Sequence, residues 1–221
     1  VEVNVDVVVK METDLVLRQI TDNADLTLVD GQPLIWISKL YGRPLKMKVS
    51  GSDLVPTLLQ AAAKEGRSVF VLGGKEDAAR KAAENIKARY SGLVMAGALS
   101  PSMGFEKKPE EVAYIRETLQ KVKPDILLAC FGCPKQEKWV SEHYRDCASG
   151  VTLCAGATVD FLAGNIKRAP KVFSENGLEW FYRFVKEPKR LFHRYFVDDM
   201  QIFRLAWKYR NAGPEHDSDV K

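Results

Sequence analysis

Polar residues that directly follow short apolar runs are the first candidates for chemistry in this sequence. Asp30 comes directly after the run 26–29 and directly before Gly31. A carboxylate in that place can accept a proton from a hydroxyl group, and the glycine lets a ligand approach the backbone closely. The alternative is that Asp30 caps the next helix, which is the commonest role of an aspartate before a helix. Position alone leaves both roles open.

Two later segments repeat this arrangement. Residues 131–139 place Lys135, Gln136 and Glu137 directly after an apolar run, a pattern that favours a ligand site and a solvated helix start equally. Residues 155–165 contain a glycine, a hydroxyl group and the carboxylate of Asp160, which is suited to hold ribose hydroxyls.

A glycine pair, Gly73-Gly74, also follows an apolar run and precedes a helical pattern. Such a place can bind a phosphate at a helix N-terminus. The pattern favours a plain tight turn instead, because the chain has neither Gly-x-Gly-x-x-Gly nor Gly-Lys-Ser/Thr.

The elements that must position these residues alternate between strand and helix. Runs that are apolar on both faces, separated by helices, predict a parallel sheet covered on both sides, and therefore an α/β fold. The start of the chain is ambiguous: Val7 to Val9 favour a strand by propensity, whereas 11–20 has helical spacing. Expected strands cover 26–29, 69–72, 93–96, 126–130 and 151–154, and expected helices cover 33–41, 52–64, 75–90, 109–122, 135–143 and 178–210.

The segment 178–210 differs in composition from the rest of the chain. It has eight basic residues, four acidic residues and ten aromatic residues, and Pro188 interrupts its helical pattern. Aromatic and basic side chains together are typical of a helix at a membrane surface, and arginines suit a diphosphate. The alternative is that the aromatic residues pack on the main domain.

Composition excludes several classes of protein. No apolar run approaches the roughly 20 residues of a spanning helix. The formal net charge of +4 is too small to indicate a nucleic-acid partner. Cys130 and Cys133 have Cys-x-x-Cys spacing, but no second pair or paired histidine accompanies them, so we expect small buried side chains and no metal site.

Several longer motifs, in order, resemble the WecG/TagA/CpsF family of bacterial glycosyltransferases over about residues 4–210. The motifs are Asn4, 29–31, 49–54, Gly132 with 134–139, 164–170, and 177–180 with 182–183 and 186–188. The resemblance implies a Rossmann-like parallel-sheet core with helices on both faces and a C-terminal helical appendage. It also implies transfer of a sugar, such as N-acetylmannosamine, from a UDP-sugar to a polyprenyl-diphosphate-linked sugar, with inversion and without a metal or other cofactor.

Roles carried over from the family are expectations for individual residues. Asp30 would be the general base, with Asn4 and Gln136 lining the same pocket. Gly104 and Phe105 would meet the uracil, with Phe105 as a stacking face, and Asp160 would hold the ribose. Further substrate-binding candidates are Lys48, Gly132, and the appendage arginines Arg183, Arg190 and Arg194, whose charge would stabilise the leaving diphosphate in place of a metal.

Two positions depart from the family pattern. Lys48 stands where the family usually has arginine, which replaces a bidentate contact by a point charge. Glu2 stands near the position where the family usually has a threonine, two residues before the asparagine, and the first strand and helix that the family has before that point are missing. The two alternatives, a truncated and an edited N-terminus, stay open, and we expect either to weaken the pocket.

We therefore expect a catalytic domain over 1–177, a membrane-binding appendage over 178–210 and a disordered tail over 211–221. The expected location is cytoplasmic, peripheral on the inner face of the bacterial cell membrane, with an anionic membrane surface as partner and no nucleic acid. The alternative function is a non-catalytic protein that binds a nucleotide-sugar or lipid diphosphate, and a homo-oligomer stays open.

Overall fold

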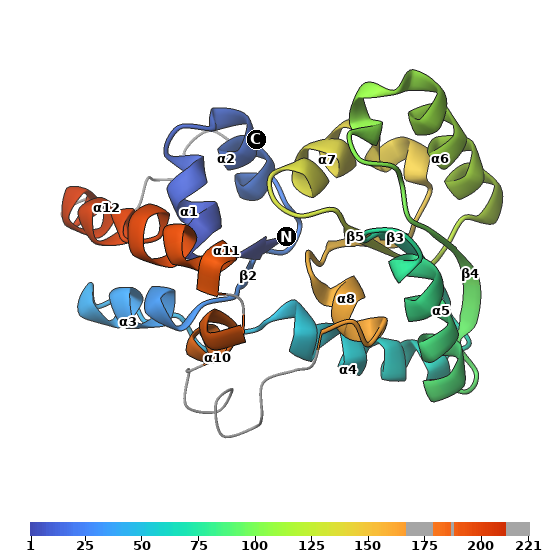
Figure 1. Cartoon of the computed structure of the whole chain (residues 1–221), viewed down its shortest axis with the longest axis horizontal. Coiled ribbons are helices and arrows are strands. Elements are labelled where there is room, and N and C mark those ends of the chain that lie inside the picture. The colour runs from blue at the N-terminus through green and yellow to red at the C-terminus, as the bar shows by residue number, and fades with distance from the viewer. Residues whose placement is uncertain (167–178, 187, 211–221) are drawn as a thin grey trace.

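The computed structural model describes residues 1–166, 179–186 and 188–210. Their helices and strands form two groups, one around a four-stranded sheet and one that joins the two ends of the chain (Figure 1). The expected tail, 211–221, and residues 167–178, which include the end of the expected catalytic domain, lie outside the described residues. The domain boundary at 177 therefore stays a prediction.

The larger group is built on a parallel sheet with strand order β4-β3-β5-β6. The central strands β3 and β5 are buried almost throughout, as expected for a parallel sheet whose faces are both covered. The strands are β3 (Ser68–Gly73), β4 (Val94–Leu99), β5 (Ile126–Cys130) and β6 (Val151–Cys154).

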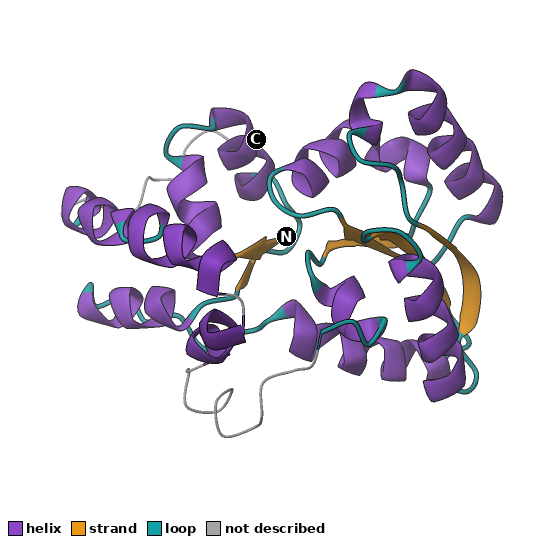
Figure 2. Cartoon of the chain, in the orientation of Figure 1, coloured by secondary structure: helices purple, strands orange, loops and turns teal. Residues whose placement is uncertain are grey.

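Helices cover both faces of this sheet (Figure 2). Val69 and Val71 point into the core on one face, and Phe70 and Leu72 point into the core on the other, which is the two-residue period of a strand. One face carries α4 (Gly51–Lys64), α5 (Ala78–Arg89) and α8 (Thr158–Leu162), and the other carries η1 (Phe105–Lys107), α6 (Pro109–Val122) and α7 (Lys135–Cys147). The predicted α/β core is confirmed.

At the glycine pair Gly73-Gly74, the backbone at the end of β3 passes very close to the backbone at the end of β5. A Cβ on Gly73 would lie 2.3 Å from the Cys130 carbonyl oxygen, and the φ of +132° is itself rare for other residues. The Gly74 amide donates to the same carbonyl at 3.0 Å. The close approach explains why glycine is required here, and the choice of a tight turn over a phosphate site stays a prediction.

The smaller group begins with two parallel strands, β1 (Glu2–Val3) and β2 (Leu28–Val29). Between them lie α1 (Val5–Met11) and α2 (Leu15–Asp22), and α3 (Gln32–Leu40) follows β2. The prediction of a strand at Val7 to Val9 is wrong, because these residues belong to α1. Asn4 caps this helix by accepting a hydrogen bond from the Val7 amide, and packing of Val7 against Leu17 outweighs the β-propensity of valine.

The C-terminal helices pack against this N-terminal segment (Figure 1). They are α10 (Glu179–Lys186), α11 (Pro188–His193), the π-helical η2 (Arg194–Asp198) and α12 (Gln201–Tyr209). Lys208 and the Tyr209 hydroxyl both bond to the carboxylate of Glu12, at the end of α1. The two ends of the described chain therefore build one unit.

Candidate active site

Asp30 lies at the carboxyl end of β2, where the Asp30 amide donates to the Val3 carbonyl at 2.8 Å. This bond holds the residue beside the end of β1. The N-cap residue of α3 is Gly31, and no side chain caps this helix. Asp30 is therefore not the N-cap residue of α3, and its role as a proton acceptor stays a prediction.

Glu2 places a second carboxyl group close to Asp30. Its Oε1 atom is buried, and a Cβ on Gly51, at the start of α4, would lie 2.1 Å from it. Burial, followed by the charge of Asp30, raises the pKa of Glu2 to about 7, with the Gly51 amide and the Val1 ammonium acting in the opposite direction and Glu137 adding to the rise. Sequence reasoning noted Glu2 only as a departure from a family pattern and missed this proximity.

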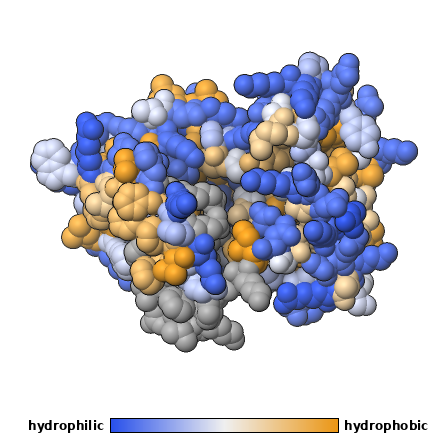
Figure 3. Space-filling view, viewed as in Figure 1, coloured by the Kyte–Doolittle hydropathy of each residue, from blue (hydrophilic) through white to orange (hydrophobic). Residues whose placement is uncertain are grey.

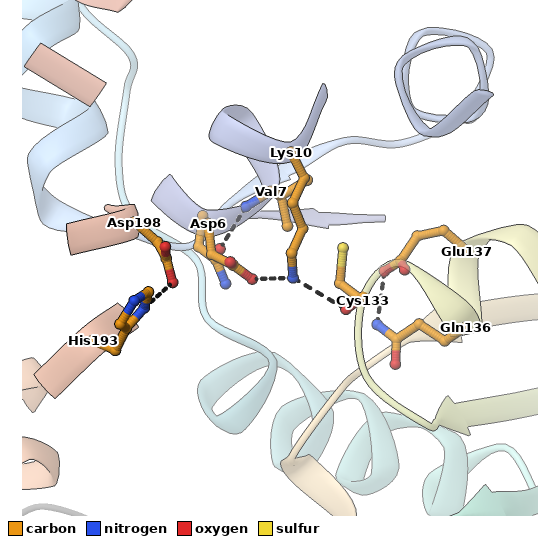
Figure 4. A network of polar contacts seen from close by, with 9 residues as sticks. Asp6, Val7, Lys10, Cys133, Gln136, Glu137, His193 and Asp198 are labelled. Carbon is orange, nitrogen blue, oxygen red and sulfur yellow. Dashed lines mark hydrogen bonds and ion pairs between the residues drawn. The ribbon is translucent and has the colours of Figure 1, made fainter. Parts of the chain in front are cut away.

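Gln136 ties together the loops that follow β5 and β6. Its Oε1 atom accepts hydrogen bonds from the backbone amides of Gly132 and Gly156, both at 3.1 Å. Its Nε2 atom donates to Glu137 Oε1 at 2.8 Å (Figure 4). Both side chains are buried, so the Gln136 amide has a defined orientation.

Glu137 was named in the sequence only as a polar residue, and its orienting contact was missed. Burial is the main reason that the pKa of its carboxyl is raised, and the Gln136 hydrogen bond acts against this rise. The signal that a sequence offers is weak, because a glutamate in the first turn of a helix is usually solvated.

Lys10 connects the two groups of elements. Its Nζ atom, on α1, donates to Asp6 Oδ2 at 2.8 Å and to the Cys133 carbonyl in the β5–α7 loop at 3.3 Å (Figure 4). Asn4, also predicted as a pocket residue, uses its Oδ1 atom to cap α1 by accepting from Val7 at 3.1 Å. Asn4 therefore orients the start of α1 at the end of β1.

The predicted stacking face of Phe105 is buried in an aromatic cluster. Its ring makes an edge contact with Phe131, with centroids 5.0 Å apart, and lies 6.0 Å from Trp139. A base cannot stack on Phe105 while the ring holds this position. Gly104, which precedes it with a φ of +75°, has open space where a Cβ would stand.

The other predicted binding residues are distributed over both groups. Lys48 is half-buried, and the next amide, Val49, donates to the Val29 carbonyl at 2.8 Å, which brings this segment beside the end of β2. Asp160 lies in α8, and its Oδ1 atom accepts from Asn165 Nδ2 at 3.2 Å. Gly132 has a φ of +86° and open space at its Cβ position.

The three appendage arginines lie on described helices: Arg183 on α10, Arg190 on α11 and Arg194 on η2. Their side chains are outside the described part of the structure. Their contact with a diphosphate stays a prediction.

The cysteines and the acidic residues show no arrangement for a metal within the described residues. No group of three or more histidine, cysteine, aspartate or glutamate side chains there could hold a metal ion. Burial raises the pKa of the Cys130 thiol to about 12, as expected of a small side chain in the core.

The fold and this site define an α/β protein with a carboxylate, that of Asp30, at the carboxyl end of a parallel strand, where folds of this class bind their ligands. The model of the "Glycosyl transferase WecG/TagA/CpsF family" matches residues 1–215. The chain belongs to this family and is a glycosyltransferase, which confirms the resemblance in the motifs.

One curated relative is the N-acetylglucosaminyldiphosphoundecaprenol N-acetyl-beta-D-mannosaminyltransferase of Bacillus spizizenii (strain ATCC 23059 / NRRL B-14472 / W23). It is 29% identical over 202 residues, which cover 91% of this chain and 76% of the relative.

Proposed function

We propose that this glycosyltransferase moves N-acetylmannosamine or a related hexose from a UDP-sugar to a sugar linked to polyprenyl diphosphate, in the synthesis of teichoic acid or another surface polysaccharide. The name of the Bacillus relative supports the acceptor class, since that enzyme acts on a diphosphoundecaprenol-linked N-acetylglucosamine. The non-catalytic alternative is not favoured, because the family is one of transferases.

The observation that carries the proposal is the place of Asp30, at a strand end and outside the cap of α3. The Asp30 carboxylate takes the proton of the acceptor hydroxyl as that oxygen bonds to the anomeric carbon. The bond from this carbon to the UDP oxygen breaks, and UDP leaves with the electron pair. A single displacement of this kind inverts the anomeric centre.

Cationic side chains stabilise the departing diphosphate in this scheme, so that no metal ion is required. Lys48 stands near the end of β2, and the appendage contributes Arg183, Arg190 and Arg194. Gly132 and Gly104 let substrate approach the backbone, and Asp160 binds the ribose. Because the Phe105 ring is buried, the uracil meets the Gly104 backbone in place of that ring.

The lipid-linked acceptor places the reaction at a membrane surface, which we assign to the cytoplasmic face. The described residues contain no helix long and apolar enough to cross a bilayer. The C-terminal helices instead expose large apolar side chains between basic ones, as an interfacial helix does. These exposed residues are Phe181, Val185, Phe192, Phe196, Phe203 and Trp207.

The test is UDP release from UDP-N-acetylmannosamine with an N-acetylglucosaminyl-diphosphate lipid, with and without a chelator. We expect Asp30→Asn to lower the rate at least about a hundredfold, the scale of a lost general base, while UDP-sugar binding is retained. Asp25→Asn, at an exposed aspartate, is the matched control. Equal rates in Asp30→Asn and the native enzyme would remove Asp30 from the mechanism, and loss of activity with the chelator would refute metal independence.

A further inference from the structure

Residues 32–48 form a second basic segment, far in sequence from the C-terminal helices. This segment, which covers α3 and the loop after it, contains four basic residues and no acidic residue. Lys39, Arg43 and Lys46 are exposed. The net charge of the chain does not reveal this local positive charge, because acidic residues elsewhere in the chain offset it.

The same segment exposes large apolar side chains. Trp36 is 56% exposed and Leu40 is 80% exposed, and their spacing of four residues places them on one face of α3. In the following loop, Met47 is 67% exposed. The opposite face of α3 is anchored, since Ile35 is buried and Leu34 packs on the core cluster of Val3, Val7 and Leu17.

The C-terminal end of α3 contacts α12. The Tyr41 hydroxyl, at the end of α3, donates to the Ala206 carbonyl of α12. On α12, Trp207 is 68% exposed and Phe203 is also exposed, and the exposed Arg204 follows Phe203 in sequence. Figure 1 shows α3 and α12 at the same end of the molecule, and apolar residues gather over that end in Figure 3.

We propose that α3, the loop 41–47 and α12 form one surface that docks on an anionic lipid bilayer. Tryptophan and aliphatic side chains enter the headgroup boundary, while lysines and arginines contact lipid phosphates. A second copy of this chain fits less well. A two-fold contact would set the four basic residues of one segment against those of its copy, and lysine is depleted at protein interfaces.

This inference deepens the proposed function, on which it rests, by stating which residues meet the membrane. Only Gly31 separates Asp30 from the first residue of α3. Docking through α3 therefore holds the proposed base close to the headgroup region, where the diphosphate-linked sugar of the acceptor projects. If the C-terminal helices alone contacted the bilayer, the position of Asp30 relative to the headgroups would be less restricted than with α3 also docked.

The test measures co-sedimentation with vesicles of phosphatidylcholine alone and of phosphatidylcholine mixed with phosphatidylglycerol. One variant removes the apolar group, Trp36→Ser with Leu40→Ser, and another removes charge, Lys39→Gln with Arg43→Gln and Lys46→Gln. The apolar control is Tyr114→Ser, and the charge control is Lys107→Gln with Lys121→Gln and Lys123→Gln, which also removes three charges. All four positions are exposed and lie on or beside α6. Circular dichroism checks the fold of each variant.

We expect the native protein to bind the anionic vesicles and both α3 variants to bind them at least about tenfold more weakly, with the controls unchanged. Transfer to a water-soluble, short-chain acceptor should stay near the native rate in the α3 variants. The inference would be overturned if both α3 variants bound the anionic vesicles as tightly as the native protein does. It would also be overturned if analytical sedimentation showed a dimer of the native protein that the α3 variants lose while they still bind vesicles. Absence of vesicle binding by the native protein would refute the membrane part of the proposed function as well, whereas the water-soluble acceptor tests the transfer itself separately.

Discussion

The sheet group and the terminal group are stabilised in different ways. In the sheet group, strands such as Ile126–Cys130 bury every residue, and two apolar clusters fill the space under the helices. In the terminal group, a smaller cluster around Val3, Val7 and Leu17 is supplemented by polar contacts such as those of Lys208 and Tyr209 with Glu12. The first group is a framework formed by neighbouring segments of chain, and the second requires both ends of the chain.

The candidate chemistry lies where these two groups meet. Asp30 and Glu2 belong to the terminal group, whereas Gln136 and Glu137 belong to the sheet group. Lys10 spans the two through the Cys133 carbonyl. The comparison implies that substitutions in the sheet core change stability most, and that substitutions at the junction change activity and pH dependence.

Leu127→Ala should have the largest effect on stability. Leu127 is fully buried in the central strand β5, and loss of such a side chain costs about 2–5 kcal/mol. Leu205→Ala, on α12, should cost less because Leu205 lies outside the two clusters of the sheet group and is 8% exposed, so its side chain loses less buried surface. Urea unfolding measures both variants, and an equal or larger loss for Leu205→Ala would remove the proposed difference between the groups.

Glu2→Gln should change how stability depends on pH. Because the folded protein raises the pKa of Glu2 from 4.5 to about 7, the stabilising effect of its protonated form is complete below pH 4.5 and is lost as the pH rises through 7. The neutral variant should therefore gain about 2 kcal/mol relative to the native protein between pH 5 and pH 8. Thermal unfolding at both pH values measures this gain. Glu110→Gln, at an exposed glutamate, is the control, and parallel pH curves for Glu2→Gln and native protein would contradict the burial of the Glu2 charge.

Exchange of the Gln136–Glu137 pair tests the orientation of the junction loops. Glu137→Ala removes the acceptor of the Gln136 amide and should lower kcat/KM about five- to tenfold, which corresponds to the free energy of one hydrogen bond. Glu137→Gln keeps an acceptor oxygen for Gln136 and should retain most activity. Gln136→Glu should lose activity as the pH rises, because ionisation of both carboxyl groups sets like charges side by side.

The double variant Gln136→Glu with Glu137→Gln should regain part of that activity, since the new carboxylate can accept from Gly132, Gly156 and the new amide. UDP release across pH 6 to 8 measures each variant. A double variant no better than Gln136→Glu alone would contradict the orienting role of this pair.

Much of the sheet group was predictable from sequence because its signals are local. Runs such as 126–130 are apolar throughout and too short for a typical helix, which favours a buried strand, and Pro109 begins α6 as its pattern predicts. The first helix was not predictable in this way. Its valines have strand propensity, and only their packing against Leu17, with the Asn4 cap, favours the helix.

The sequence by itself determined the α/β class and the glycosyltransferase family, because periodicity and ordered motifs are properties of adjacent residues. Its choice of Asp30 as a proton acceptor stays a prediction. Only the tertiary structure decided that Gly31 and not Asp30 is the N-cap of α3, that the Glu2 carboxyl lies close enough to Asp30 and Glu137 for their charges to raise its pKa, and that the Phe105 ring is buried. It also decided that α3 joins α12 through Tyr41 and Ala206. The physical reason is that proximity, burial and pKa depend on contacts between residues far apart in the chain, which no local pattern records.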